Sequence, residues 1–403
     1  MRVLYVNSVC GKGSTGKIVE QLADAVIAGG GEALVCYGRN GYEGVIPSFR
    51  FCSDNANKIN ALMQRIFDNE GLGLRSPTKK LIKKIKEFNP DVIHLHNLHG
   101  YYLNYKLLFE FLAKSKIKVV WTLHDCWAFS GHCAYFDFSA CNKWETGCYN
   151  CPNKKEYPKS LLSDNSKKQY KLKKQTFLSL KAKQTIIVSP SNWLDNLVSK
   201  SFLKEYKHIV LNNGIDTDIF KRTDNHSFDK VMDRSKKIVL AVAGNWCPRK
   251  GYNDVIKIAE GLDDEYKVVM VGVSDKQFEE LKDTDITAIK RTSSQTELAE
   301  LYSMAYCFIN TTYEDNYPTV NLEALACGCP VITYDTGGSV EPITEENGII
   351  VEQGNIEEML AAIQNSIKTD TKSGVEADDV TNYDNLFMVN NYIKLYNELL
   401  TGD

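Results

Sequence analysis

The 403-residue sequence has no apolar run that approaches the roughly 20 residues needed to span a membrane as a helix. It also has no tandem repeat and no low-complexity tract, and only 10 of its residues are proline. No charge sign dominates, and the net charge of -3 argues against a protein whose whole surface binds nucleic acid. These absences leave a globular protein that is long enough for two domains with cores of their own.

The first residues, MRVLYVNSVCGKG, include an apolar stretch that is too short for a secretory signal peptide. We therefore expect a cytoplasmic protein, with peripheral attachment to the inner face of the cell membrane as a further option. Thiols are kept reduced in the cytoplasm, so disulfides are the least expected state of the 12 cysteines.

Short β-branched runs alternate with amphipathic stretches along most of the chain, which is typical of parallel α/β sheets. Ligand sites of such sheets lie at the carboxyl ends of the strands. The predicted strands are Val3–Val6, Ala33–Tyr37, Val92–Leu95, Val119–Leu123, Ile186–Ser189, Ile238–Ala243, Val268–Val271, Cys307–Asn310, Val331–Tyr334 and Ile349–Val351.

The series of strands restarts after a polar segment, Thr223 to Lys237, which we take as a domain boundary. The prediction is an α/β protein with two Rossmann-like domains, 1–222 and 223–403, facing each other across a cleft. The first domain contains a cysteine-rich insert near 126–152. The last amphipathic helix, at 383–400, could cap either domain.

A glycine-rich sequence, SVCGKGSTGKIVEQL, follows the first predicted strand. It matches most of a Walker A phosphate loop, but Ile18 stands where Ser or Thr would hold Mg²⁺. Two other interpretations are a loop whose backbone N–H groups bind a phosphate or sugar, and a turn that needs glycine only for its geometry. If the loop binds a phosphate or sugar, the residues of this acceptor or phosphate loop are Gly13, Ser14, Thr15 and Gly16.

The second half contains the sequence YEDNYPTVNLEALACGCPVITYDTGG. A helix is predicted to begin near Thr319, where free N–H groups would suit an anionic diphosphate. Glu323, one turn into this helix, can accept hydrogen bonds from two ribose hydroxyls. Asp315 stands eight positions before it, across the preceding loop.

With these motifs the sequence resembles the retaining glycosyltransferases of family 4, which have the GT-B fold. The signature EALACGCPV at 323–331 and the later Gly337-Gly338 match that family, as do AGNWCPRKG at 243–251, NNGID at 212–216 and SPSNW at 189–193. The resemblance covers nearly the whole chain in order. It implies transfer of a sugar from a UDP- or GDP-sugar, with the donor in the C-terminal domain and the acceptor mainly in the N-terminal one.

The resemblance also implies roles for individual residues. His124 matches the active-site histidine that contacts the donor sugar, and Lys250 matches the retained phosphate-binding lysine. The first signature carboxylate falls on Asp315, with Glu314 just before it, where the family usually has Glu. The family's phosphate-binding arginine falls on Asn245, and Arg249 could supply the lost charge. The implied donor-nucleotide site comprises Asn245, Arg249, Thr319, Val320, Asn321 and Glu323.

Three histidines in the sequence DVIHLHNLHG, at 94, 96 and 99, have a spacing that metal ligands can adopt. The alternative is a strand that leads into a loop near the acceptor, to which we assign His96 and Asn97. No acidic metal-binding motif is placed for the diphosphate, so we expect no catalytic metal.

The insert contains four clustered cysteines, Cys133, Cys141, Cys148 and Cys151. Four thiols in a reduced compartment suit a structural Zn²⁺, which would order a long loop that has little periodic structure. Buried thiols without a metal are the main alternative, and disulfides or a redox role are another.

Ten lysines stand against Glu156 and Asp164 between residues 154 and 183. This segment is either a solvated helix face or a patch that binds an anionic membrane surface.

The family often uses lipid-linked acceptors, and we expect a glycan or polyprenyl-diphosphate-linked acceptor and no nucleic-acid partner. The resemblance thus implies a hexosyltransferase of bacterial surface polysaccharide synthesis. A two-domain sugar-nucleotide epimerase and a non-enzymatic sugar-nucleotide-binding regulator remain alternatives.

Overall fold

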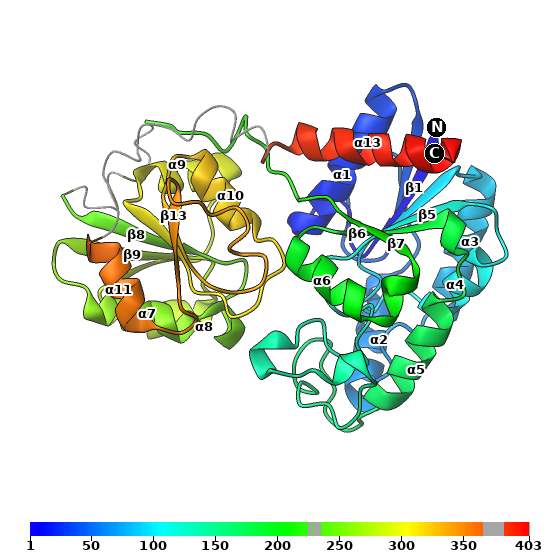
Figure 1. Cartoon of the computed structure of the whole chain (residues 1–403), viewed down its shortest axis with the longest axis horizontal. Coiled ribbons are helices and arrows are strands. Elements are labelled where there is room, and N and C mark those ends of the chain that lie inside the picture. The colour runs from blue at the N-terminus through cyan, green and yellow to red at the C-terminus, as the bar shows by residue number, and fades with distance from the viewer. Residues whose placement is uncertain (225–227, 229–234, 366–382, 403) are drawn as a thin grey trace. The chain divides into compact units, whose positions relative to one another are not determined.

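A computed structural model describes residues 1–224, 228, 235–365 and 383–402 (Figure 1). The chain divides into two compact units, one formed by Met1–Asn212 with Val389–Asp403 and the other by Asn213–Met388. The division therefore falls before the polar segment 223–237, part of which lies outside the described residues.

The first unit is built around a seven-stranded parallel sheet with the order β3-β2-β1-β4-β5-β6-β7. Its strands are β1 (Arg2–Asn7), β2 (Glu32–Tyr37), β3 (Ser48–Arg50), β4 (Val92–Leu95), β5 (Lys118–Thr122), β6 (Thr185–Ser189) and β7 (Lys207–Val210). Its helices are α1 (Gly13–Ala28), α2 (Asp54–Phe67), α3 (Arg75–Phe88), α4 (Tyr105–Leu112), α5 (Ser166–Phe177) and α6 (Asn192–Lys200). Short 3-10 helices are η1 (Asp137–Ser139), η2 (Lys143–Glu145), η3 (Ala182–Gln184) and η4 (Phe202–Glu205).

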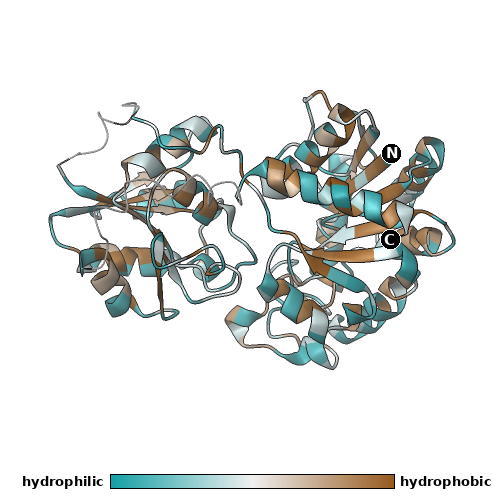
Figure 2. Cartoon of the chain, turned by 45° about the horizontal axis from the view of Figure 1, so that its top comes forward, coloured by the Kyte–Doolittle hydropathy of each residue, from teal (hydrophilic) through white to brown (hydrophobic). Residues whose placement is uncertain are grey.

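Helices cover both faces of this sheet, because successive side chains of each strand point to opposite sides. Leu4 and Val6 of β1 belong to a core shared with α3, α4, α5 and α6. Tyr5 points the other way, and its hydroxyl donates to the backbone oxygen of Leu22 in α1 at 3.1 Å. The strands of both sheets are largely hydrophobic in Figure 2, as expected for parallel sheets that are buried on both faces.

The last helix, α13 (Asn385–Thr401), completes the first unit from Val389 onwards. The Tyr396 hydroxyl lies 2.6 Å from Nδ1 of His94, and the Tyr392 hydroxyl lies 3.0 Å from Oγ1 of Thr122. The end of the chain is thus hydrogen-bonded to the central strands β4 and β5.

The second unit has a six-stranded parallel sheet with the order β10-β9-β8-β11-β12-β13. Its strands are β8 (Lys237–Val242), β9 (Tyr266–Val271), β10 (Ile286–Ile289), β11 (Cys307–Asn310), β12 (Val331–Tyr334) and β13 (Gly348–Val351). Its helices are the 3-10 helix η5 (Pro248–Lys250) and the α-helices α7 (Tyr252–Gly261), α8 (Asp275–Glu280), α9 (Gln295–Met304), α10 (Thr319–Ala326) and α11 (Ile356–Asn365).

Two hydrophobic cores lie on the two faces of this sheet. Leu240 of β8 packs with side chains of α9 and α10, whereas its neighbours Val239 and Ala241 pack with those of α7 and α11. Figure 1 shows these helices on the two sides of the sheet. The two parallel α/β sheets confirm the predicted fold class.

Three strands, β3, β7 and β10, escaped the sequence analysis, and all of them are edge strands. Each has one neighbouring strand and is less buried than the central strands. Their sequences therefore lack the continuous apolar runs that mark a strand buried on both faces. None of the helices in the described part of the chain combines the length and the apolar character that a membrane span needs.

Candidate functional site

The expected site residues gather at the point in each sheet where the strand order reverses, so that successive strands are added on opposite sides of it. In the first sheet this point lies between β1 and β4, and in the second between β8 and β11. Loops that leave the carboxyl ends of two such neighbouring strands diverge and form a binding crevice.

The glycine-rich sequence forms the turn between β1 and α1. Gly11 and Gly13 have φ values of +65° and +66°, which favour glycine, and the Gly11 N–H donates to the Gly16 oxygen at 3.0 Å. A Cβ atom on Gly16 would lie 3.1 Å from Val9 and 3.3 Å from the Gly11 nitrogen, so this close packing also favours glycine. No side chain caps α1 at Lys12, which leaves the N–H groups of its first turn available to an anion.

Two histidines meet beside this turn. Nδ1 of His96, just after β4, lies 3.0 Å from Nε2 of His124, which follows β5. Burial lowers the pKa of His124 to about 4, while Asp125 acts in the opposite direction. Burial and then His94 lower the pKa of His96 well below its ordinary value. Both rings are therefore neutral at pH 7.

His96 is 1% exposed, and its Nε2 atom has no hydrogen-bond partner in the described part of the chain. Asn97, the next residue, approaches the glycine-rich turn, with its Nδ2 atom 3.5 Å from Oγ1 of Thr15. The structure thus brings together the acceptor-side residues that the sequence predicted from two separate loops.

The other two histidines of the DVIHLHNLHG sequence have protein partners. The ring nitrogens of His94 lie 2.8 Å from Thr122 Oγ1 and 2.6 Å from the Tyr396 hydroxyl. Nε2 of His99 lies 2.7 Å from a carboxylate oxygen of Asp125. The histidine-metal alternative is therefore wrong for the described residues, where no group of three or more His, Cys, Asp or Glu side chains could hold a metal ion.

In the second unit, η5 after β8 lies against the loop after β11. The Lys250 ammonium forms an ion pair with the Asp315 carboxylate, and these side chains are 22% and 16% exposed. The Arg249 guanidinium donates to the backbone oxygen of Glu314. Burial alone would raise the pKa of Asp315, but the positive charges of Lys250 and Arg249 hold it below the ordinary carboxyl value.

Glycine allows these loops to pack closely. A Cβ on Gly251 would lie 2.2 Å from the Thr311 oxygen, and one on Gly337 would lie 2.1 Å from the Asp315 oxygen. The signature glycine at 337 therefore supports the backbone of the carboxylate that binds Lys250.

Helix α10 begins at Thr319 and has no side-chain cap at Pro318. Its first two residues, Thr319 and Val320, are partly exposed, so their backbone N–H groups can meet a ligand. One turn later, Glu323 is partly exposed and accepts a hydrogen bond from the Tyr302 hydroxyl at 3.3 Å.

Three residues with expected roles differ in how far they are buried. The Asn321 side chain is fully buried, and its amide group is hydrogen-bonded to Asn310 and to the Ser339 oxygen, so in this structure it supports the fold. Glu314 is fully buried as well, which leaves Asp315 as the carboxylate beside Lys250. Asn245 is exposed.

Two Asp-x-Asp sequences, at 216–218 and 283–285, escaped the sequence analysis. The Asp216 carboxylate accepts from the backbone N–H groups of Asp218 and Ile219. Asp285 forms an ion pair with Lys267. Neither sequence lies in the loops that carry Lys250 and Asp315.

The cysteine-rich insert lies between β5 and α5 and is ordered by packing. Phe136 and Trp144 stack with their ring centroids 5.0 Å apart, and Trp144 also meets Phe129 at 5.4 Å. The buried Lys173 ammonium lies 3.6 Å from the Trp127 ring centroid and donates to the Trp127 oxygen at 2.7 Å.

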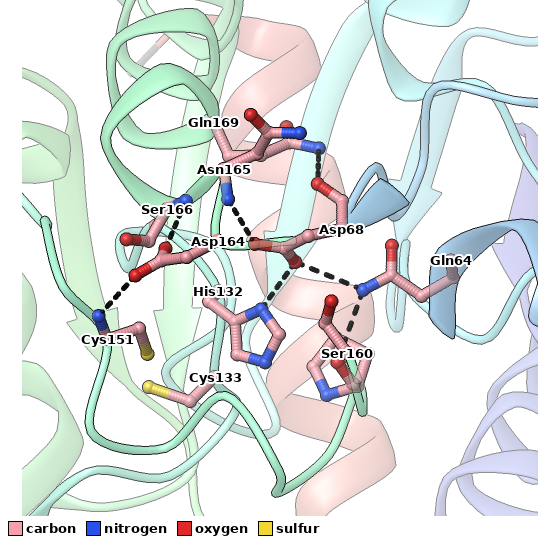
Figure 3. A network of polar contacts seen from close by, with 12 residues as sticks. Gln64, Asp68, His132, Cys133, Cys151, Ser160, Asp164, Asn165, Ser166 and Gln169 are labelled. Atoms are coloured by element: carbon pink, nitrogen blue, oxygen red, sulfur yellow. Dashed lines mark hydrogen bonds and ion pairs between the residues drawn. The ribbon is translucent and has the colours of Figure 1, made fainter. Parts of the chain in front are cut away.

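A polar network, buried at Asp68 and His132 and exposed at Asp164, fastens the insert to α2 and α5 (Figure 3). Asp68, which ends α2, accepts from Nδ1 of His132 at 2.5 Å and from the Asn165 N–H at 2.7 Å. Asp164 accepts from the N–H groups of Cys151 and Ser166 at 2.7 and 3.0 Å. The network supplies order that the sequence analysis attributed to a metal.

The four clustered cysteines line one small cavity of the insert. The Cys133 thiol is hydrogen-bonded to Cys151, which lowers the pKa of Cys151 to about 7. The Gly131 N–H donates to the Cys148 sulfur at 3.1 Å. In the part of the chain that the structure describes, these thiols are not placed as a metal-binding group, so the structure gives no support to the predicted structural zinc.

A cavity of about 510 Å³ lies at the amino ends of strands of the first sheet, whereas the expected site residues lie at the carboxyl ends. It is lined by residues near the beginnings of β4 and β5, among them Asp91 and Lys118. It contains none of the expected site residues, and we assign it no part in the site.

Two family profiles match the chain. Residues 17–219 match "Glycosyltransferase Family 4", and residues 224–377 match "Glycosyl transferases group 1". These ranges cover both units.

Similar proteins include WcaC of Escherichia coli (strain K12), which is named as a colanic acid biosynthesis glycosyl transferase. It is 26% identical over 312 residues, which cover 76% of this chain and 73% of WcaC. The N,N'-diacetylbacillosaminyl-diphospho-undecaprenol alpha-1,3-N-acetylgalactosaminyltransferase of Campylobacter jejuni is 26% identical over 54% of this chain and 61% of its own length.

Solved structures share the fold over the whole chain. Sucrose-phosphate synthase of Thermosynechococcus elongatus superposes with a TM-score of 0.73 at 14% identity, covering 100% of both chains. HepE of Anabaena in complex with UDP-glucose gives a TM-score of 0.67 at 14% identity, covering 99% of this chain and 100% of its own.

Proposed function

Since the chain belongs to glycosyltransferase family 4 and has the GT-B fold, we propose that it is a retaining hexosyltransferase that uses a nucleotide sugar. The proposed acceptor is a glycan or a polyprenyl-diphosphate-linked glycan of bacterial surface polysaccharide synthesis. The printed names of WcaC and of the Campylobacter enzyme support this substrate class. In this proposal the second unit binds the donor and the first unit the acceptor.

The Lys250–Asp315 ion pair is the observation that carries the proposal. It holds an ammonium group at the carboxyl ends of β8 and β11, where α/β sheets bind nucleotides. A departing nucleoside diphosphate gains about one negative charge, which a preorganised ammonium and backbone N–H groups stabilise. Lys250 and the uncapped start of α10 would perform this role.

If transfer occurs in a single step, retention requires that the acceptor oxygen attack the sugar on the face that the diphosphate leaves. The bond from the anomeric carbon to the phosphate oxygen breaks, the bond to the acceptor oxygen forms, and the departing phosphate oxygen takes the acceptor proton. No protein base is needed for this step, and the neutral His124 would donate a hydrogen bond to the donor sugar.

Glu323 would accept from the ribose hydroxyls of the donor, because it lies one turn into α10 and Tyr302 orients its carboxylate. The donor is proposed to be a UDP- or GDP-sugar, and the UDP-glucose complex of HepE supports UDP. No catalytic metal is proposed, because Lys250 and helix N–H groups supply the positive charge that the diphosphate needs.

The glycine-rich turn, Asn97 and the His96–His124 pair would form the acceptor side. The unpartnered Nε2 of the buried His96 and the uncapped α1 start provide polar atoms that a sugar or phosphate group can engage.

The structural zinc remains part of the proposal for the insert. If Cys133, Cys141, Cys148 and Cys151 hold one zinc, elemental analysis finds about one Zn per chain, with Zn–S distances near 2.3 Å. Metal-free protein of full stability and activity would instead make these residues packed thiols.

We also propose peripheral attachment to an anionic membrane through 154–183. Lys173, one of the ten lysines of this segment, cannot take part in membrane binding, because it is 1% exposed and burial lowers its pKa to about 7. The exposed lysines of α5 and its flanks would supply the attraction.

Thermal unfolding in the presence of UDP, GDP, ADP and their sugars tests the donor proposal, because a ligand of the native state raises its stability by mass action. We expect one nucleotide and its sugar to raise the melting temperature, followed by transfer to an acceptor. Isomerisation of the donor sugar alone would favour an epimerase. Tight donor binding without transfer or hydrolysis would favour a regulator.

A further inference from the structure

Helix α2 turns its apolar face to solvent. Leu62, Met63 and Phe67 lie on the same side of the helix as Ile59 and Ile66, at the spacing of an amphipathic stripe. The exposed fractions are 64% for Ile59, 56% for Leu62, 40% for Met63 and 46% for Phe67. A surface helix of a globular protein normally has such a stripe against the core.

The polar face of α2 is the one that packs on the protein. Side-chain amides of this face donate to backbone oxygens of three other segments. Asn57 donates to Gly38 at 2.7 Å, Asn60 to Tyr101 at 3.2 Å, and Gln64 to Pro158 at 3.2 Å. At the end of the helix, Asp68 binds His132 and Asn165 (Figure 3). These hydrogen bonds fix the orientation of α2, so the outward stripe is a property of the fold.

The apolar surface continues into the loop before α5. Leu161 and Leu162 are 54% and 73% exposed. The Leu161 N–H donates to the Arg65 oxygen at 2.7 Å, and Nδ2 of Asn165 donates to the Phe67 oxygen at 2.6 Å, which holds this loop beside the end of α2.

Positive side chains border this surface. Lys58 and Arg65 lie along one edge of the stripe, and Lys159 precedes the two leucines. All three are exposed, and none of them forms an ion pair in the described part of the chain. An apolar stripe edged by cations has the character of helices that lie in the interface of an anionic bilayer.

We propose that the α2 surface, defined as Ile59, Leu62, Met63, Ile66, Phe67, Leu161 and Leu162, docks on an anionic lipid bilayer and inserts its apolar side chains into it. This inference rests on the proposed peripheral attachment and adds insertion to it. A second copy of the chain fits less well, since a twofold contact through the stripe would bring Lys58 and Arg65 near their own counterparts.

Flotation of the full chain with phosphatidylcholine vesicles, with and without phosphatidylglycerol, tests the proposal. We expect binding that requires phosphatidylglycerol and that falls by about tenfold or more in the Leu62→Ser/Phe67→Ser variant. The Val45→Ser/Ile27→Ser variant is the matched control, because these apolar side chains are also exposed, at 95% and 36%, and lie outside the α2 surface. Thermal unfolding checks that both variants keep their fold.

Equal vesicle binding by the Leu62→Ser/Phe67→Ser variant and the wild type would overturn insertion, as would an absence of binding. A wild-type dimer in sedimentation that this variant converts to a monomer would assign the surface to a second copy and also overturn the proposal. Donor-dependent transfer to an acceptor without vesicles is measured separately, so failure of lipid binding and failure of the proposed transfer reaction are distinguishable.

Discussion

The Lys250 ammonium and the Asp315 carboxylate form an ion pair between loops that are 65 residues apart in sequence. The pair is possible because β8 and β11, which precede these loops, are neighbours in the sheet. A lysine held in this way can stabilise developing charge without reorganising during the reaction.

Replacement of Lys250 by alanine should lower turnover by roughly 10²-fold or more, the scale for removal of one charge-stabilising group. The variant also leaves the Asp315 carboxylate without its partner, which further disfavours a bound diphosphate. Initial rates of nucleotide release at saturating donor measure the effect. Lys282→Ala is the control, since this exposed lysine pairs with Glu279 elsewhere in the unit. Wild-type turnover in Lys250→Ala would refute the proposed role.

Glu323→Ala should weaken nucleotide binding more than it slows turnover at saturating donor, because the carboxylate is proposed to contact the ribose and not the reacting atoms. Calorimetric titration with the nucleoside diphosphate gives the change in Kd. Glu279→Ala, an exposed carboxylate outside the site, should bind as wild type does. An unchanged Kd in Glu323→Ala would remove this residue from the donor site.

Activity should persist in EDTA without added Mg²⁺, because the proposal assigns charge stabilisation to Lys250 and the start of α10. The measurement compares transfer rates in EDTA and in excess Mg²⁺ or Mn²⁺. A strict requirement for added metal would contradict the proposed mechanism.

The free energy of unfolding should fall as the pH is lowered from about 6.5 towards 4. Burial lowers the pKa of His94, His96 and His124, so the unfolded chain binds protons in this range that the folded chain does not. Each such histidine contributes a slope of up to about 1.4 kcal/mol per pH unit. Denaturant unfolding at pH 7 and pH 5 measures the difference, and equal or greater stability at pH 5 would show that these histidines are not buried in the neutral form.

The sequence was most informative about central strands. Val92–Leu95 and Cys307–Asn310 coincide with β4 and β11 because a strand buried on both faces needs a continuous apolar run. The edge strands β3, β7 and β10 lack that run. The orientation of α2 was also beyond the sequence, since an apolar stripe is ordinarily a sign of the buried face.

Candidate site residues were predicted where a motif fixes a backbone position, as with Lys250 and Glu323. The role of His94 depends on Tyr396, which lies 302 residues further along the chain, so no local pattern could indicate it. Asn321 lies within the motif, but the helix turns its side chain into the core. Spacing alone does not distinguish such a residue from its exposed neighbours.

Transfer with retention is the central claim, and NMR spectroscopy of the product tests it most directly. The protein is incubated with an acceptor glycan and the nucleotide sugar that stabilises it most, and the anomeric configuration of the product is compared with that of the donor. We predict release of one nucleoside diphosphate per glycoside formed, with the donor configuration kept. An inverted glycoside, or an isomerised donor sugar with no nucleotide released, would contradict this account.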